Sequence, residues 1–236
     1  MRDEPLLYDL TDSPFCAKAR MCLQVKGVPY RRVTLTVGKL RELRQVNPLG
    51  KVPVLMDHGR PVADSSTIAR HLEAQHPEPP LLPADPAARA YASLLEDWAD
   101  ESLYFVVGAF KWLNPANRKT ALDRTMSELG GGALRPIVAR IAARRIARSY
   151  RAWGYGPESL PHFEERMRES LAWLAELVQG RAFLLGRTLT IADVAVYAQL
   201  AWMREYAEAR LLAEQPAVVA WLAHLDAIPA VRDGLA

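Results

Sequence analysis

Cysteine is scarce in this sequence, because its 236 residues include only Cys16 and Cys22. Two cysteines exclude a disulfide-scaffolded fold and a zinc site with four thiolates. The sequence has no histidine, cysteine and carboxylate residues grouped at the spacing of metal ligands, so we expect no metal cofactor. The net charge of +3 is also small, since 30 Lys and Arg oppose 27 Asp and Glu, and it gives no indication of nucleic-acid binding.

Long hydrophobic runs are also lacking. The most apolar stretch, LTIADVAVYAQLAWM, contains Asp193 and Gln199 and is shorter than a bilayer span. The first ten residues, MRDEPLLYDL, carry acids where a signal peptide carries bases. Hydrophobic residues still make up 50% of the chain and charged residues 24%, which is typical of a globular protein. We therefore expect a soluble cytoplasmic protein.

Proline is concentrated in one segment, residues 77–86, which read PEPPLLPADP. Five prolines in ten residues exclude a helix or a central strand, so this segment is expected to be an extended linker. It divides the chain into a first domain at residues 1–79 and a second at residues 87–236.

The first domain alternates between strand and helix signals. Strands are expected at LLYDL, at Tyr30–Thr36 and on both sides of the Asp57-His58-Gly59 turn. Helices are expected after the Ser13-Pro14 cap, at Lys39–Val46 and at Ser66–Gln75. The order β-α-β-α-β-β-α predicts a small layered α/β domain.

The second domain has almost no strand signal, and its apolar residues recur at helical spacing. Helices are expected at residues 87–113 (long, or broken near Gly108), 116–129, 134–150, 159–179, 191–209 and 216–226. Gly130-Gly131-Gly132 ends the second of these, and Thr190 with Asp193 forms a capping box. The pattern predicts an all-α helical bundle.

Three short motifs in the first domain contain residues that are able to bind a ligand or stabilise a reacting group. Ser13 stands at a helix N-terminus, where free N–H groups favour an anion, although Ser-Pro is also a common cap. Pro53 lies between two valines at the start of a strand, where a proline removes a hydrogen-bond donor. A cis Val52-Pro53 bond would explain it, because the Val52 N–H and C=O would then be free to pair with an extended peptide. The alternative is a proline in an edge strand.

The third motif is Asp64-Ser65-Ser66, in which one of the serines is expected to cap the following helix. Helix N–H groups and a hydroxyl suit a carboxylate, and the adjacent acid suits an ammonium group. The motif is therefore able to hold both charges of an α-amino acid, with a simple capped helix as the alternative interpretation.

Together, these motifs and NPLGKVPVL make the chain resemble the glutathione S-transferase family. The resemblance implies an α/β thioredoxin-like N-terminal domain followed by an all-α helical bundle domain. It also implies an enzyme that uses glutathione as co-substrate, with a small hydrophobic electrophile as the second substrate. Members commonly form two-fold dimers, so the resemblance further implies a homodimer.

The resemblance assigns roles to particular residues. Ser13 would donate a hydrogen bond to the glutathione thiolate and act as the catalytic residue. The expected glutathione-binding residues are Phe15, Lys39, Lys51, Val52, Pro53, Asp64 and Ser65. Among them, Val52 would pair with the cysteinyl backbone, while Asp64 and Ser65 would hold the γ-glutamyl end. Either lysine would meet the glycyl carboxylate.

Several alternatives remain open at this stage. Tyr8 is a rival thiolate donor, and Cys16 would make the protein a thiol–disulfide oxidoreductase, unless it is merely a buried apolar side chain. The electrophile is expected between the domains, against aromatic residues at helical spacing: Trp98, Tyr104, Phe105, Phe110 and Trp112.

A third hypothesis is a non-catalytic binding protein. Residues 135–151 contain six arginines and no acid, and a basic amphipathic helix of this kind is able to contact an anionic membrane or an acidic partner. We favour instead an exposed helix whose arginines pair with acids elsewhere in the chain.

Overall fold

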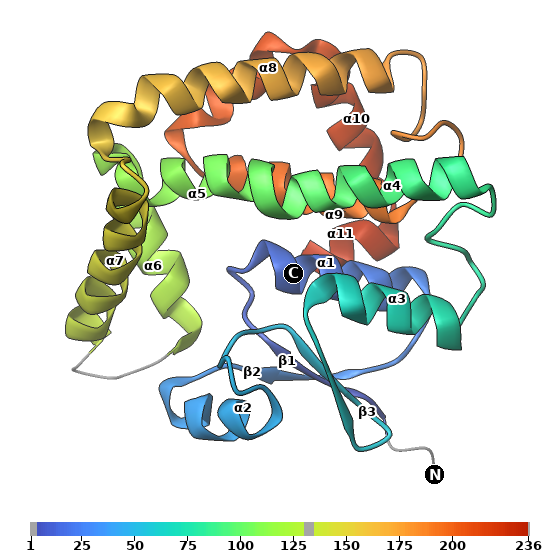
Figure 1. Ribbon diagram of the computed structural model, residues 1–236, viewed down its shortest axis with the longest axis horizontal. Coiled ribbons are helices and arrows are strands. Elements are labelled where there is room, and N and C mark those ends of the chain that lie inside the picture. The colour runs from blue at the N-terminus through green and yellow to red at the C-terminus, as the bar shows by residue number, and fades with distance from the viewer. Residues whose placement is uncertain (1–3, 130–134, 236) are drawn as a thin grey trace.

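The N-terminal strands form one mixed sheet in the computed structural model, which describes residues 4–129 and 135–235 (Figure 1). The strand order is β2-β1-β3-β4, with β1 and β2 parallel and β3 antiparallel to both of its neighbours. The strands are β1 (Leu6–Asp9), β2 (Arg31–Thr34), β3 (Val54–Asp57) and β4 (Arg60–Ala63).

Helices cover both faces of this sheet. Two of them, α1 (Pro14–Val25) and α3 (Ser65–Gln75), lie between the sheet and the helical domain, whereas α2 (Leu40–Val46) covers the opposite face (Figure 1). Successive side chains of β1 point to opposite faces, so Leu7 joins the main core while Tyr8 packs beneath α2. The predicted order β-α-β-α-β-β-α is confirmed.

The proline-rich segment is fixed by a buried ion pair. Lys26 donates to the Glu73 carboxylate and to the Pro79 carbonyl oxygen. The same carboxylate accepts from the backbone N–H groups of Leu81 and Leu82. The segment is therefore extended, as its prolines predict, and is anchored to the end of α3.

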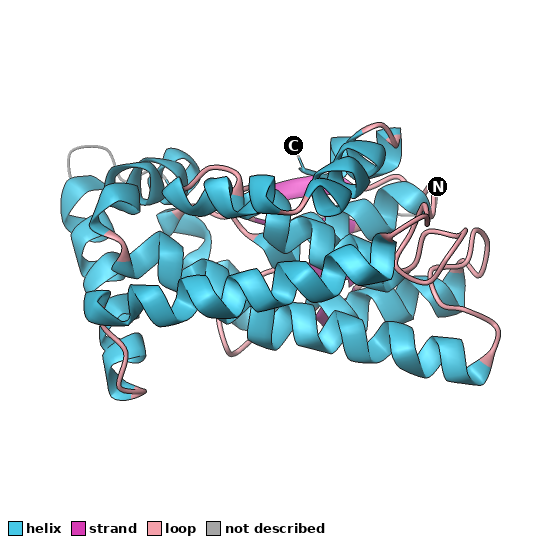
Figure 2. Ribbon diagram, turned by 90° about the horizontal axis from the view of Figure 1, so that it is seen from above, coloured by secondary structure: helices cyan, strands magenta, loops and turns pink. Residues whose placement is uncertain are grey.

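The C-terminal domain is a helical bundle. Its helices are α4 (Pro86–Trp98), α5 (Tyr104–Leu113), α6 (Arg118–Leu129), α7 (Arg135–Ala152), α8 (Leu160–Val178), α9 (Ile191–Met203), α10 (Pro216–Asp226) and α11 (Pro229–Leu235). Seen from above, these helices lie over the strands (Figure 2). None of the helices in the described part of the chain is long and apolar enough to cross a membrane.

Of the two alternatives expected for residues 87–113, a long helix or one broken near Gly108, the structure has the long one. A π-helical turn at Ala99–Leu103 joins α4 to α5 in one continuous element. Gly108 lies inside α5, where an added Cβ would come within 2.5 Å of the Tyr150 hydroxyl. The glycine therefore allows close packing of α7 on α5 rather than ending the helix. The Gly130–Gly132 stop lies outside the described residues.

The centre of the bundle is α9, whose residues are all buried. The expected capping box is confirmed, because the Asp193 carboxylate accepts from the Thr190 N–H and hydroxyl, both at 2.9 Å. The helix packs against both α1 and α4 and so joins the two domains. It ends at Met203 rather than at residue 209, and a 3-10 helix at Ala207–Glu214 follows.

The last helix, α11, was not predicted from the sequence. It packs on α1 so closely that a Cβ at Gly234 would lie 2.8 Å from the backbone of Met21. The buried Arg20 guanidinium donates to the carbonyl oxygens of Gly234 and Leu235 and pairs with Asp9 at 2.6 Å. These bonds hold α11 on the first helix.

Candidate active site

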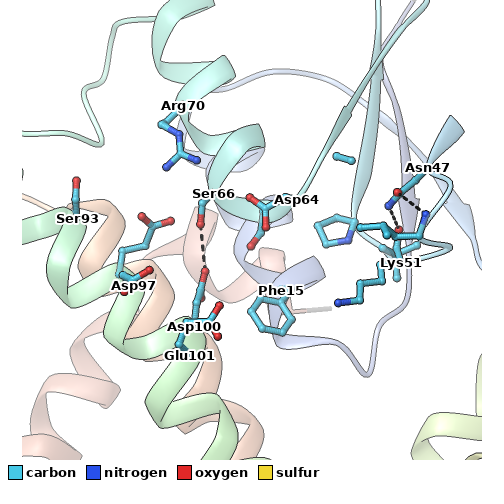
Figure 3. Close-up of a pocket in the computed structure, with 16 residues that line it drawn as sticks. Phe15, Asn47, Lys51, Asp64, Ser66, Arg70, Ser93, Asp97, Asp100 and Glu101 are labelled. Carbon is cyan, nitrogen blue, oxygen red and sulfur yellow. Dashed lines mark hydrogen bonds between the residues drawn. The ribbon is translucent and has the colours of Figure 1, made fainter.

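A cavity of about 600 Å³ lies where α1, the loop before β3, the start of α3 and α4 meet (Figure 3). Its lining includes six of the predicted site residues: Phe15, Lys51, Val52, Pro53, Asp64 and Ser65. Ser13 and Lys39 are not part of this lining. The sequence motifs of the first domain thus converge on one cavity from three separate segments.

The Val52-Pro53 peptide bond on one wall is cis. The backbone N–H and C=O of Val52 form no hydrogen bond with any residue that the structure describes. Because β3 begins only at Val54, these two groups are available to pair with an extended peptide in the cavity. Lys51 next to them is exposed and supplies a positive charge at the same wall.

Asp64 lies across the cavity and has an unusual backbone conformation. Its φ is +80°, a region that residues other than glycine rarely adopt. The Asp64 Oδ1 accepts from the Thr67 N–H at 2.9 Å and caps α3. The expectation that Ser65 or Ser66 caps this helix is therefore wrong: α3 begins at Ser65, one residue earlier, because the carboxylate is the stronger acceptor of the helix N–H groups.

Ser65 is thereby left with a free side chain. Ser65 is 1% exposed, and its Oγ lacks a hydrogen-bond partner among the described residues. A buried hydroxyl without a partner is uncommon, since its desolvation is not compensated. Here the hydroxyl lies at the N-terminus of an eleven-residue helix and lines the cavity, so it suits an anionic ligand group.

A buried charged cluster closes the floor of the cavity, and sequence reasoning missed it. The Lys18 ammonium on α1 lies 2.5 Å from both the Glu96 and Asp100 carboxylates. Lys18 also donates to the Ser66 hydroxyl. That hydroxyl donates in turn to Asp100 (Figure 3). The sequence features that could have indicated this cluster are a lysine within the apolar helix α1 and two acids four residues apart in the helical domain.

This cluster has two carboxylates for one ammonium group. Burial lowers the pKa of Lys18, but the charges of Asp100 and Glu96 outweigh that effect and raise it above its usual value. Burial raises the pKa of Asp100, and Lys18 offsets the effect only in part. Asp100 Oδ1 is itself buried without a partner, so the cluster presents excess negative charge that favours a ligand ammonium group.

Ser13 is the N-cap of α1, as predicted. Its Oγ accepts from the Cys16 N–H at 3.3 Å, which leaves the hydroxyl hydrogen available for another acceptor. The residue lines a neighbouring hollow of about 190 Å³ together with Pro14 and Trp202. Phe15, two residues further along, lines the large cavity, so the start of α1 borders both spaces.

The residue before Ser13 anchors this loop to the helical domain. Asp12 is buried and accepts from Lys111 at 2.5 Å, from Thr125 at 2.7 Å and from the Trp202 indole N–H at 3.0 Å. Burial lowers the pKa of Lys111 to about 8, although Asp12 partly opposes the shift. Three helices thus converge on one carboxylate and fix the position of the following serine.

Two residues predicted for the site, Tyr8 and Lys39, lie against Glu42 of α2 instead of lining the cavity. The Tyr8 hydroxyl donates to Glu42 at 2.7 Å on the α2 side of the sheet and lines neither space. Burial and the Glu42 carboxylate raise the pKa of Tyr8 to about 12. Lys39 is exposed and donates to the same carboxylate at 2.8 Å. Of the two lysines considered for a terminal carboxylate, Lys51 is the one in the cavity wall.

Cys16 is completely buried inside α1. Burial raises the pKa of its thiol to about 12, and the nearby Asp9 charge contributes in the same direction. A thiol of this kind is neither exposed nor ionised near neutral pH, so the geometry favours the buried apolar role over thiol–disulfide exchange. Cys22 is buried in the same way, also with a pKa of about 12.

The aromatic residues expected to line the electrophile site do not share one space. Phe110 is completely buried, whereas Phe105 and Trp112 line two different hollows. Trp98 packs against the main core, and Tyr104 contacts the site, because its ring packs on Phe15 with centroids 4.7 Å apart and stacks on Trp202. Helical spacing could not separate core aromatics from lining ones.

The structure thus joins a thioredoxin-like sheet, with a cis-proline loop and an acid–serine pair, to a helical bundle, which is a two-domain protein class defined by fold. Residues 7–80 match the family described as glutathione S-transferase, N-terminal domain, and residues 138–224 match glutathione S-transferase, C-terminal domain. The chain therefore belongs to the glutathione S-transferase family. The predicted fold, an α/β thioredoxin-like domain followed by an all-α bundle, is confirmed.

Individual relatives support this assignment. The chain is 39% identical over 108 residues to glutathione S-transferase U22 of Arabidopsis thaliana. The aligned segment covers 44% of this chain and about half (49%) of that relative. The β-etherase LigF of Sphingobium sp. strain SYK-6 has a TM-score of 0.76 at 22% identity, covering 98% of each chain. A Pseudomonas fluorescens family member solved with two glutathione molecules bound has a TM-score of 0.73 at 21% identity, covering 100% of this chain and 93% of that one. At such identities the two structures show a shared fold.

Residues 4–129 and 135–235 contain no group of three or more His, Cys, Asp and Glu side chains that could hold a metal ion.

Proposed function

We propose that this protein is a glutathione-dependent transferase that joins the glutathione sulfur to a small hydrophobic electrophile. The observation that carries the proposal is the unpartnered Ser65 hydroxyl beside the Asp64 carboxylate at the start of α3. This pair offers a donor for the α-carboxylate and an acceptor for the α-ammonium group of the γ-glutamyl residue.

The rest of the cavity suits the remainder of the tripeptide. The free backbone groups of Val52 would pair with the cysteinyl residue, as a strand adds to a sheet edge. Lys51 would meet the glycyl carboxylate, and the excess negative charge at Asp100 would strengthen binding at the ammonium end. The sequence of charges along the cavity thus follows the order of charges in glutathione.

Ser13 is proposed to stabilise the thiolate. Its oxygen already accepts from the Cys16 N–H, so its O–H is free to donate to sulfur. A thiol whose ordinary pKa is about 8.5 would then ionise near neutral pH, because a hydroxyl donor and a helix N-terminus both stabilise the anion and lower its pKa. The thiolate would attack an electrophilic carbon held in the hollow beside Ser13 and Trp202, forming a C–S bond as the leaving group departs with its electron pair.

Calorimetric titration with S-methylglutathione tests whether the cavity is used. We expect binding to the unmodified protein and a loss of about tenfold or more in affinity for Ser65→Ala, since a hydrogen bond to a charged group contributes about 1.5–3 kcal/mol. The matched control is Ser127→Ala, an exposed serine on α6. Equal affinity of the two variants, or no binding by the unmodified protein, would contradict the assignment.

We further propose that the protein is a homodimer. Tyr91 and Leu94 on α4 and Leu49 in the cavity lining are exposed apolar side chains, which a second copy of the chain would cover. Sedimentation equilibrium is the direct measurement, with a mass near twice 26.3 kDa as the expected result.

A further inference from the structure

A second cavity, of about 200 Å³, lies between the end of α5 and the hairpin of α6 and α7. Its lining shares no residue with the glutathione cavity described above. Three arginines contribute to it, Arg118 from α6 and both Arg144 and Arg151 from α7. Its lining contains no Asp or Glu.

The three arginines share another property. None of them forms an ion pair or a side-chain hydrogen bond with a residue that the structure describes. Other arginines of the same domain do form such pairs: Arg124 with Glu205, and Arg204 with Asp226. The expectation that the arginines of residues 135–151 pair with acids elsewhere therefore fails for Arg144 and Arg151, and the cavity keeps an uncompensated positive charge.

Helix geometry explains how these charges face one space. Arg144, Ala147 and Arg151 follow one another at intervals of three and four residues, so they share one face of α7. The small Ala143 and Ala147 line the same space between α7 and α5, so the arginines share it with side chains that take up little room.

The remaining walls are mostly apolar. Trp112, Leu113, Leu122, Pro115 and Pro157 contribute apolar groups, and the one uncharged polar residue is Asn114, whose side chain donates to Glu208 and accepts from the Ala116 N–H. The Lys111 ammonium at the back is paired with Asp12 and lies 4.9 Å from the Trp112 ring, so its charge is already balanced. Apolar walls with a few convergent polar groups are typical of small-molecule sites.

We infer that this cavity binds a small organic anion that has one carboxylate-type group on a flat apolar body. The planar guanidinium fork matches the two oxygens of such a group, and the apolar walls accommodate an aromatic ring. A volume of about 200 Å³ is below that of a site for drug-sized ligands, which limits the body to about one ring. The inference does not depend on the proposed transferase activity.

The test is calorimetric titration of the full chain with 3-phenylpropanoate, with the neutral 3-phenylpropan-1-ol as the matched ligand. The variant Arg144→Gln with Arg151→Gln removes both α7 guanidinium groups from the cavity. The matched control, Arg145→Gln with Arg148→Gln, removes the same charge from α7 at positions that are equally exposed but lie outside the lining. A third variant, Arg144→Lys with Arg151→Lys, keeps the charge but loses the fork. Circular dichroism establishes that each variant is folded.

We expect the anion to bind the unmodified protein and the alcohol to bind much more weakly. Removal of the two cavity arginines should weaken anion binding by about tenfold or more, the lysine variant should be intermediate, and the control should change it by no more than about twofold. Saturating S-methylglutathione should leave the affinity unchanged. Equal losses in both glutamine variants, equal binding of the alcohol, displacement by S-methylglutathione, or no binding at all would each overturn the inference.

Discussion

The Lys111 ammonium lies 2.5 Å from the Asp12 carboxylate, in a buried pair that joins α5 to the residue immediately before Ser13. The same carboxylate accepts from Thr125 and from the Trp202 indole. The position of the candidate catalytic serine therefore depends on the helical domain as well as on the thioredoxin-like domain. The two domains of the chain contribute to one loop.

The Lys111 pair predicts a particular pH dependence of stability. The pKa of Lys111 is lowered to about 8 in the folded protein from 10.5 in the unfolded chain. Between these values the unfolded chain holds a proton that the folded protein has released, so this residue makes the unfolding free energy rise with pH. The slope approaches ~1.4 kcal/mol per pH unit. Urea unfolding of the unmodified protein and of Lys111→Met between pH 7 and pH 10 measures it.

We expect the stability difference between the two proteins to grow in favour of the unmodified one as the pH rises above 8. The buried Cys16 and Cys22 thiols, with pKa values raised to about 12, contribute the opposite slope, but they do so in both proteins. The exposed Lys119 provides a matched control, Lys119→Met. A constant difference across this pH range would show that Lys111 is not held at a lowered pKa.

The cluster around Lys18 predicts a large loss of stability on removal of its one cation. Lys18→Met leaves Glu96 and Asp100 buried without an ammonium partner, and breaking a buried pair in this way costs about 3–5 kcal/mol. Lys119→Met also removes a lysine that pairs with an aspartate, but at an exposed position where such pairs have little effect. Urea denaturation at pH 7 compares them. Similar midpoints for the two variants would mean that the buried cluster is not held together by Lys18.

Cys16 and Cys22 are predicted to be unreactive in the native protein. Both are completely buried and both thiols have a pKa of about 12, so neither supplies an exposed thiolate. With 5,5′-dithiobis(2-nitrobenzoic acid) at pH 8, we expect colour to develop only as the protein unfolds, and to be fast in urea. Cys22→Ser separates the two residues. Rapid native reaction at Cys16, or a mixed disulfide with glutathione there, would support the oxidoreductase alternative instead.

Much of the fold could be predicted because its signals are local. The Ser13-Pro14 cap, the Thr190–Asp193 capping box and the prolines of residues 77–86 each act within a few residues. The α10 boundaries, residues 216–226, were predicted without error for the same reason. The end of α9 was placed wrongly, and the sequence left open whether α4 continues into α5, because packing decides both, as the close approach of Gly108 and Tyr150 illustrates for α5.

The residues of the candidate site could be predicted only where they belong to a short contiguous sequence motif. Pro53, Asp64 and Ser65 lie in contiguous segments whose residue types indicate their chemistry. Lys18 and Asp100 are 82 positions apart, and Asp12 and Trp202 are 190 apart, so no spacing rule links them. The last helix was missed for a similar reason, since α11 is short and is held by Arg20 of the first helix rather than by a pattern of its own.

The central claim is that Ser13 stabilises the thiolate of glutathione bound in the large cavity. A pH titration of the protein–glutathione complex, followed by the ultraviolet absorbance of the thiolate, tests it most directly, with Ser13→Ala beside the unmodified protein and Ser127→Ala as the control. We expect a bound thiol with a pKa about one unit or more below that of the free thiol, and return of the pKa toward the free value in Ser13→Ala alone. A bound thiol that titrates like free glutathione, or the same lowered pKa in Ser13→Ala, would contradict it.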